Sequence, residues 1–258
     1  MTEPTTERVR IPGGVGAELA GTIERPAGET RGFVLFVHAF GSSKDLRGTI
    51  RVARRLAELG FASLRFDFTG LGHSDGRFAD TTLATNLDDV EAVVRWLAAR
   101  GDRVTLIFGH SLGGAAALLT APRLADVAAF VTLATPSTTS HLRDTLLRLA
   151  PALETEPESP VTVAGKTVTI GRQLLDDLSS HDLAAAAASL AKPLLILHSA
   201  EDEIVALDHA SALYRSAAHP KSFVSLDGAD HLLLARERDA DFVAELVAAF
   251  VARYEVRD

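Results

Sequence analysis

Short apolar runs alternate along the chain with longer segments in which apolar residues recur every three to four positions. The clearest run, GFVLFVHAF at 32–40, has the composition of a strand buried on both faces. The segment 45–60 that follows carries apolar residues from Ile50 to Leu59 at helical spacing and ends at Gly60, where a helix often stops. This alternation predicts βαβ units and a parallel sheet.

The same reading extends along the rest of the chain. It predicts strands at 61–68, 103–110, 127–136, 193–200 and 222–228, and helices at 82–100, 112–124, near 207–218 and at 239–254. Thr82 is placed to cap the first of these helices. Because no internal repeat or interdomain linker interrupts the pattern, we predict a single α/β domain over 1–258, with a mostly parallel central sheet and helices on both faces.

The alternation breaks between about 137 and 190, where the chain becomes helical and polar. Within it, VTVAGKTVTIG at 161–171 alternates apolar and polar residues around Ala-Gly, which predicts a hairpin. The run AAAAA at 184–188 predicts a helix. We expect the segment 137–190 to be a small cap inserted into the domain.

Composition narrows the functional classes. The 258 residues are 47% hydrophobic and 23% charged, which is ordinary for a globular protein, and the net charge of −8 argues against a nucleic-acid partner. The lack of cysteine excludes disulfides, thiolate metal sites and cysteine nucleophiles. No apolar signal core or membrane-spanning run is evident, so we expect a cytoplasmic protein with no membrane role.

Two stretches fit the G-x-S-x-G pattern of a serine nucleophile: GHSDG at 72–76 and GHSLGG at 109–114. Such a serine needs a strand leading into a sharp turn and a helix leaving it. Ser111 has both, and Gly109 and Gly113 permit the tight backbone. Ser74 has neither, so we expect it in a surface turn.

A serine hydroxyl becomes a good nucleophile only when a histidine accepts its proton and a carboxylate orients that histidine. His231 stands out because it lies in a loop just after the last predicted strand. His38, at the end of a strand, is expected to position other groups, and His110 to pack or hydrogen-bond locally within the elbow. His198 lies near the end of a buried strand. The remaining histidines are expected to be solvated: His141, His181, His209 and His219.

For the acid, Asp202 follows the strand predicted at 193–200, in the loop where a fold of this kind presents its carboxylate. Glu201 and Glu203 are its near competitors. Asp230 lies beside His231 in sequence and is expected to be exposed, because a sequence neighbour rarely reaches Nδ1. Asp227 is a weaker candidate still.

The transition state of acyl transfer also needs donors for its oxyanion. We expect these to be the backbone N–H groups of Leu112, directly after the serine, and of Phe40, in the loop after the strand at 32–40. The Phe40 side chain either walls the acyl pocket or packs in the core.

With Ser111, Asp202 and His231 in that order, the chain resembles the α/β-hydrolase superfamily of serine hydrolases over roughly 8–256. The motifs HAFGSSKD, RFDFTGLGHSDG, GHSLGG, HSAEDEIV and HPKSFVSLDGADHLL carry the resemblance. The second and last of these, with RQLLDDL, look similar to bacterial α/β-hydrolases that are often fused to an osmotically inducible, peroxidase-like domain.

Two features differ from those relatives. The chain ends soon after FVARYEVRD, so we expect no fused domain, and HAFGSSKD lacks the cysteines that their oxyanion loop often carries. The cap resembles the hairpin-bearing insertion of cinnamoyl and feruloyl esterases.

The resemblance implies a carboxylic-ester hydrolase acting on small to medium acyl groups through an acyl-enzyme, with no cofactor or metal and a small-molecule ester as partner. Other readings stay open: the same triad acting on a thioester, lactone, amide or C–C bond, acyl transfer instead of hydrolysis, or a catalytically silent ligand-binding protein. A dehalogenase or epoxide hydrolase is disfavoured because those enzymes carry Asp where this chain has Ser111. The sequence indicates no oligomeric state.

Overall fold

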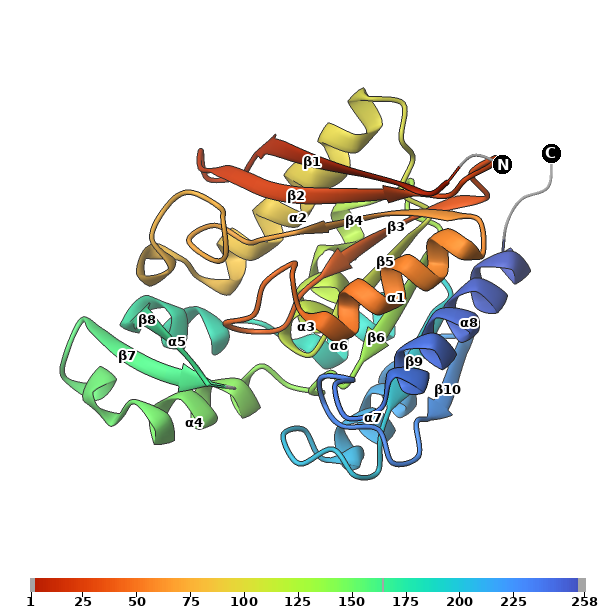
Figure 1. Cartoon of the computed structure of the whole chain (residues 1–258). Helices are drawn as coiled ribbons and strands as arrows, with labels where there is room; N and C mark the ends of the chain where they lie inside the picture. Colours follow the sequence, from red (N-terminus) through yellow and green to blue (C-terminus); the bar gives the residue numbers. More distant parts are fainter. Residues whose placement is uncertain (1–2, 164, 255–258) are drawn as a thin grey trace.

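A sheet of eight strands forms the centre of the protein in a computed structural model that describes residues 3–163 and 165–254 (Figure 1). The strands lie in the order β1-β2-β4-β3-β5-β6-β9-β10. Their bounds are Thr5–Pro12 (β1), Glu18–Arg25 (β2), Gly32–Val37 (β3), Phe61–Phe66 (β4), Leu106–His110 (β5), Ala129–Leu133 (β6), Leu194–His198 (β9) and Lys221–Ser225 (β10).

From β4 to β10 all neighbouring strands pair in parallel, whereas β1 and β2 pair antiparallel at one edge. The predicted mostly parallel sheet is therefore confirmed. The strands β3, β4, β5, β6 and β9 are buried at every position, which explains why their sequences are mostly apolar, with Arg65 of β4 as the charged exception. No strand was predicted before residue 32, so β1 and β2 are additions to the predicted sheet.

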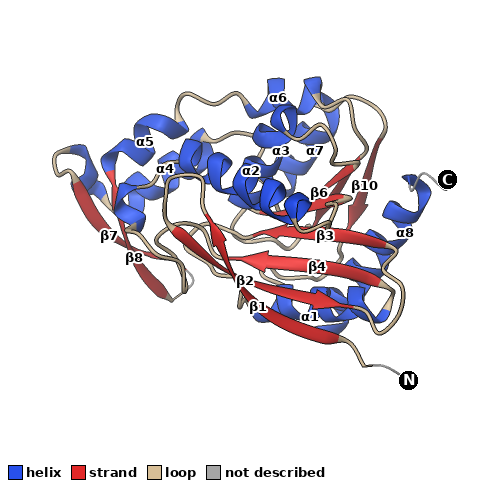
Figure 2. Ribbon diagram, turned by 90° about the horizontal axis from the view of Figure 1, so that it is seen from above, coloured by secondary structure: helices blue, strands red, loops and turns tan. Residues whose placement is uncertain are grey.

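Helices cover both faces of the sheet, as predicted (Figure 2). On one face lie α1 (Arg47–Glu58) and α8 (Glu237–Tyr254), which pack against each other. On the other lie α2 (Leu83–Ala99), α3 (Leu112–Thr120), α6 (Leu183–Ser189) and α7 (Leu207–Ser216).

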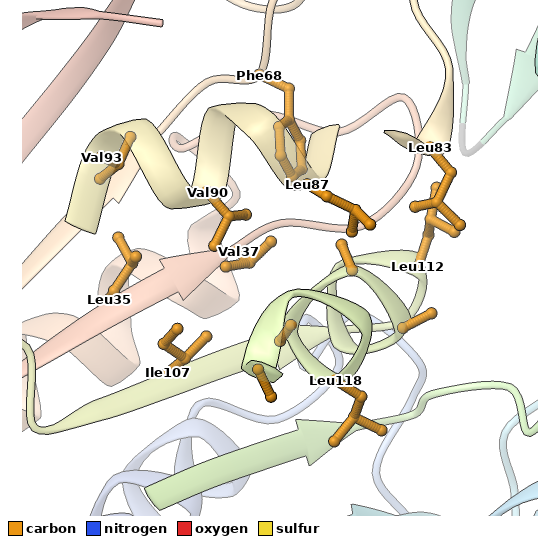
Figure 3. Close-up of a cluster of buried hydrophobic side chains, with 14 of the residues drawn as sticks. Leu35, Val37, Phe68, Leu83, Leu87, Val90, Val93, Ile107, Leu112 and Leu118 are labelled. Carbon is orange, nitrogen blue, oxygen red and sulfur yellow. The ribbon is translucent and has the colours of Figure 1, made fainter. Parts of the chain in front are cut away.

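The core on the second face joins β3 and β5 to α2 and α3 (Figure 3). Leu35 of β3 and Val90 and Val93 of α2 are fully buried there, beside Ile107 of β5. The packing fixes α3 against the sheet, and with it the turn that carries Ser111.

The helix termini follow the predicted signals. Thr82 caps α2 by accepting from the N–H of Thr85 at 3.2 Å, and the Thr85 hydroxyl in turn accepts from the N–H of Thr82 at 2.9 Å. Gly60 follows α1 with φ +91°, a conformation that favours glycine.

The segment after β6 projects beyond the carboxyl ends of the strands (Figure 1). It contains α4 (Ser140–Leu149), a hairpin of β7 (Glu158–Val163) and β8 (Lys166–Gly171), and α5 (Arg172–Leu178). The predicted hairpin is confirmed, and residue 164 lies outside the described residues. The helix α6 was also expected to belong to the cap at 137–190. It packs against α3 and α7 and so covers the sheet, not the cavity.

Candidate active site

Ser111 lies at the sharp turn between β5 and α3, where its backbone adopts φ 54° and ψ −120°. A positive φ is uncommon for a residue with a side chain and stores strain. Its N–H donates to the carbonyl of Leu133 at 2.8 Å, which ties the turn to β6. The strand, turn and helix predicted for GHSLGG are therefore present.

Two glycines beside Ser111 allow this turn because no side chain would fit there. A Cβ on Gly113 would overlap the carbonyl oxygen of Val37, and a Cβ on Gly109 would overlap the backbone of Gly114. The close approach of α3 to β3 and β5 thus depends on both glycines.

Ser74 lies in the long loop after β4, with no helix leaving it. Its hydroxyl accepts from the N–H of Ala20 at 2.9 Å and donates to the carbonyl of Asp67 at 2.6 Å. The predicted turn is confirmed, but the side chain is half-buried and its hydroxyl joins the loop to β2.

Asp202 and His231 meet at the carboxyl end of the sheet. Nδ1 of His231 donates to Oδ2 of Asp202 at 2.7 Å, and both side chains are buried. Oδ1 of Asp202 accepts from the N–H groups of Ile204 at 2.8 Å and Val205 at 2.9 Å. All of these partners favour an ionised carboxylate.

The pKa of Asp202 reflects these contacts. Burial by itself raises it, but the hydrogen bond and charge of His231, with the two backbone donors, outweigh burial and hold the pKa below its ordinary value. Asp202 therefore stays ionised and fixes His231 as the tautomer whose Nε2 can accept a proton.

The competing acids have other partners. Glu201 accepts from the N–H of Gly228 at 2.9 Å, and Asp227 accepts from the hydroxyl of Ser225 at 2.8 Å. Glu203 is exposed. Asp230 is half-buried, not exposed as expected, because it accepts from backbone N–H groups of the loop that follows it.

His110 reaches much further than predicted. Its Nε2 donates to the backbone carbonyl of His231 at 2.8 Å, across 121 residues of sequence, and the two rings lie 5.1 Å apart. The expectation of a local contact is therefore wrong. Burial, with the neighbouring His231, lowers the pKa of His110 to about 3, so the ring is a neutral donor.

His38 supports the loop that should supply the second oxyanion donor. Its Nδ1 donates to the carbonyl of Ala39 at 2.8 Å, and its Nε2 accepts from the N–H of Phe68 at 3.2 Å. Burial lowers its pKa, which keeps the ring neutral and suits this pair of contacts. His38 thus links the loop after β3 to the loop after β4.

The backbone N–H groups of Phe40 and Leu112 have no acceptor among the described residues, and both residues line the cavity that Ser111 faces. The Phe40 ring lies 5.5 Å from that of Phe78, so it packs on the core and also lines the cavity. Two unused donors beside a strained serine are what an oxyanion needs.

The loop from β3 to α1 is tied to β4 by a buried charge network that the sequence analysis missed. Oδ1 of Asp67 accepts from the N–H of Lys44 at 2.6 Å, and Oδ2 accepts from the N–H of His73 at 2.9 Å. Nζ of Lys44 lies 3.1 Å from Oδ2 of the same aspartate. Arg65 donates to the Lys44 carbonyl and to Glu24.

Ser111 and His231 line one cavity of about 270 Å³ beneath the cap. Among the described residues no direct hydrogen bond joins their side chains. The wall is mostly apolar and includes Ala39, Phe40, Gly41, Ser42, Leu46, Leu112, Pro136, His141, Leu142, Thr145, Leu146, Leu149, Val163, Lys166, Ile204, Val205, Leu232 and Leu234.

Three of the histidines expected to be solvated are in fact half-buried and have partners. The rings of His141 and His209 pack edge to face with their centres 4.7 Å apart, and Nδ1 of His209 accepts from the N–H of Ser137 at 3.1 Å. His181 lies 3.2 Å from Asp177.

The cavity face of α4 could have been read from the sequence. Its lining residues are His141, Leu142, Thr145, Leu146 and Leu149, which recur every three to four positions as one face of a helix does. Lys166, on β8, lines the same cavity and was likewise not singled out.

Among the described residues no group of three or more histidine, aspartate or glutamate side chains is arranged to hold a metal ion. Within that same part of the chain no helix has the length and apolar character needed to cross a bilayer.

Comparisons with known proteins identify relatives that share this fold. Residues 34–246 match the model of the alpha/beta hydrolase family. The esterase domain of a Rhodothermus marinus protein is 37% identical, with a TM-score of 0.80 over 97% of this chain and 99% of that one. Est1E of Butyrivibrio proteoclasticus, solved with ferulic acid bound, is 24% identical and shares the fold, with a TM-score of 0.78 over 95% of this chain and 99% of that one. The uncharacterized protein YfhR of Escherichia coli K12 is 25% identical over 83% of this chain and 69% of its own length.

Proposed function

The chain belongs to the alpha/beta hydrolase family, and from that premise we propose that it is a serine hydrolase cleaving carboxylic esters of small to medium acyl groups. Ser111 is the nucleophile, His231 the general base and Asp202 the acid that orients it. The observation that carries the proposal is the 2.7 Å hydrogen bond between His231 and Asp202 at the cavity that Ser111 lines.

In the first half-reaction, Ser111 Oγ attacks the ester carbonyl while His231 Nε2 takes its proton. The N–H groups of Phe40 and Leu112 hold the developing oxyanion, and each such donor contributes about 2.7–4 kcal/mol to the transition state. The imidazolium then returns the proton to the leaving alcohol, and the acyl group stays on Ser111.

In the second half-reaction, His231 removes a proton from water, which attacks the acyl-enzyme and releases the acid. Asp202 stabilises the imidazolium each time it forms. The neutral His110 holds the backbone of His231 in place through both steps.

An ester is favoured over other acyl substrates by two observations. The cavity wall is mostly apolar, which suits an acyl chain or ring, and the Rhodothermus marinus neighbour at 37% identity is an esterase domain. The same groups could also attack a thioester, lactone, amide or C–C bond, or pass the acyl group to an alcohol. A panel of matched acyl donors separates these reactions.

The proposal is tested by turnover of 4-nitrophenyl acetate. Ser111→Ala should abolish it while circular dichroism shows an intact fold, and Ser74→Ala should keep turnover because Ser74 serves the structure of its loop. Full activity in Ser111→Ala would contradict the assignment.

A further inference from the structure

Among the described residues that line the cavity, Lys166 is the only lysine, arginine, aspartate or glutamate. The wall contains no aspartate or glutamate to balance it. Lys166 is exposed and also lines the cavity, so its ammonium is solvated and lies within reach of a molecule bound there.

The register of the hairpin places Lys166 on the inward side. Val163 pairs with Lys166, and Val161 pairs with Val168, so these four side chains share one face. Val161 is buried, and a Cβ on Gly41 of the loop after β3 would lie 3.8 Å from the Val168 side chain. The face that carries Lys166 is therefore turned toward that loop.

The opposite face of the hairpin is exposed. It carries Thr162 and Thr167, whose hydroxyl oxygens lie 2.8 Å apart in solvent.

Lys166 also lacks the partners that the other lysines have. Lys44 pairs with Asp45 and Asp67, Lys192 donates to the carbonyl of Leu124 and its neighbours, and Lys221 donates to the carbonyls of Tyr214 and Ala217. Among the described residues, Lys166 Nζ has no hydrogen-bond acceptor and no carboxylate within 4.0 Å.

The arginines of the cap, like the other lysines, each have a polar partner. Arg143 lies 3.4 Å from Asp144, Arg148 donates to Thr145 at 2.8 Å, and Arg172 donates to a backbone carbonyl at 3.0 Å.

We propose that Lys166 binds an anionic group on the substrate, so that the preferred esters carry a free carboxylate away from the bond that is cleaved. This rests on the proposed esterase function. A single ammonium matches the charge of a carboxylate better than that of a dianionic phosphate, which usually takes several donors.

The test compares esters of matched carbon skeleton, in which one member of each pair carries a free carboxylate and the other a neutral group. For the acyl side, 4-nitrophenyl hydrogen adipate is compared with 4-nitrophenyl hexanoate, and for the alcohol side, 4-acetoxybenzoate with its methyl ester. The measured quantity is the ratio of kcat/KM for the charged ester to that for the neutral ester.

In at least one pair this ratio should fall about tenfold in Lys166→Met and further in Lys166→Glu, as expected for a lost charge-assisted hydrogen bond. The matched control is Thr167→Glu, which makes the same change in net charge as Lys166→Met on the outward face of the hairpin and should keep the wild-type ratio.

A ratio that is the same in wild type and Lys166→Met for both pairs would overturn this inference alone. A larger Lys166-dependent preference for 4-acetoxyphenyl phosphate than for 4-acetoxybenzoate would overturn the carboxylate assignment. Failure of the wild type to cleave any of these esters would overturn the proposed function, and this inference with it.

Discussion

Oδ2 of Asp202 accepts a hydrogen bond of 2.7 Å from Nδ1 of His231, although 29 residues separate the two along the chain. The other oxygen of the carboxylate is held by the N–H groups of Ile204 and Val205. Because the acid is fixed from both sides, it can fix the imidazole in turn, with Nε2 directed away from it.

This pair predicts a large loss of activity in Asp202→Asn. The amide can present N–H to Nδ1 and so favour the wrong tautomer, and kcat should fall by about 10⁴, as in other serine hydrolases with this change. Steady-state kinetics on 4-nitrophenyl acetate measure the loss.

Glu201→Gln is the matched control, because Glu201 precedes the acid but binds Gly228 and Ser199 instead of the histidine. It should keep kcat within a few-fold of wild type. Equal losses in the two variants would contradict the assignment of Asp202.

His110 predicts how stability depends on pH. The pKa of His110 is about 3 in the folded protein and about 6.5 in an unfolded chain. As the pH falls from about 6.5 toward 3, the His110 ring becomes protonated in the unfolded chain but stays neutral in the folded protein. The free energy of unfolding therefore decreases, by up to about 1.4 kcal/mol per pH unit from this group.

Urea unfolding at pH 7, 6 and 5 measures this slope. His110→Gln should lower stability at pH 7 and flatten the slope, because the titrating ring is gone. His219→Gln, at an exposed position, should keep the slope of the wild type. A slope that is equally steep in His110→Gln would show that His110 does not titrate in this way.

Gly113 predicts a severe steric effect. A Cβ there would overlap the carbonyl oxygen of Val37, so Gly113→Ala must push α3 away from β3. We expect a loss of about 3 kcal/mol or more in the free energy of unfolding, in line with forced overpacking of a core. Gly28→Ala, where a Cβ would meet open space, should change stability by less than about 1 kcal/mol. Similar urea midpoints for both variants would contradict the close approach of α3.

The buried network behind the loop that carries Phe40 predicts a further cost. Asp67→Asn leaves Lys44 with only the half-exposed Asp45 to balance its charge. We expect a loss of about 3 kcal/mol in stability, at the low end for a broken buried ion pair. Asp75→Asn breaks only an exposed pair with Arg10 and should cost less than about 1 kcal/mol. Chemical denaturation compares the two, and equal costs would contradict the role of the network.

Much of the fold was predictable because burial imposes a period on the sequence. The runs that became β3, β5 and β9 are apolar up to the histidine that ends β5 and β9, because helices cover both faces of the sheet. The residues at which the strands end were less predictable. The apolar run at 32–40 continues past Val37, because Ala39 is buried beneath the loop, not in the sheet.

The positions of Ser111, Asp202 and His231 were predictable from motif and order, because each follows a strand of a parallel sheet and the carboxyl ends of such strands meet at one edge. The contact from His110 to His231 was not. It depends on how two loops fold together, and nothing in the spacing of 121 residues specifies it.

The cavity lining falls between these cases. His141 and Lys166 each follow a local period, of α4 and of the hairpin, that marks their faces as inward. Tertiary packing decides which surface the cap covers. The sequence therefore did not show that these inward faces line the cavity of Ser111, and the fold was needed to show it.

The most direct test of the central claim is labelling with a fluorophosphonate probe followed by peptide mapping. Because the probe phosphonylates a serine activated by a histidine, the label should lie on the peptide that contains Ser111 and should be absent from Ser111→Ala. A label on Ser74, or equal labelling of wild type and Ser111→Ala, would contradict the account.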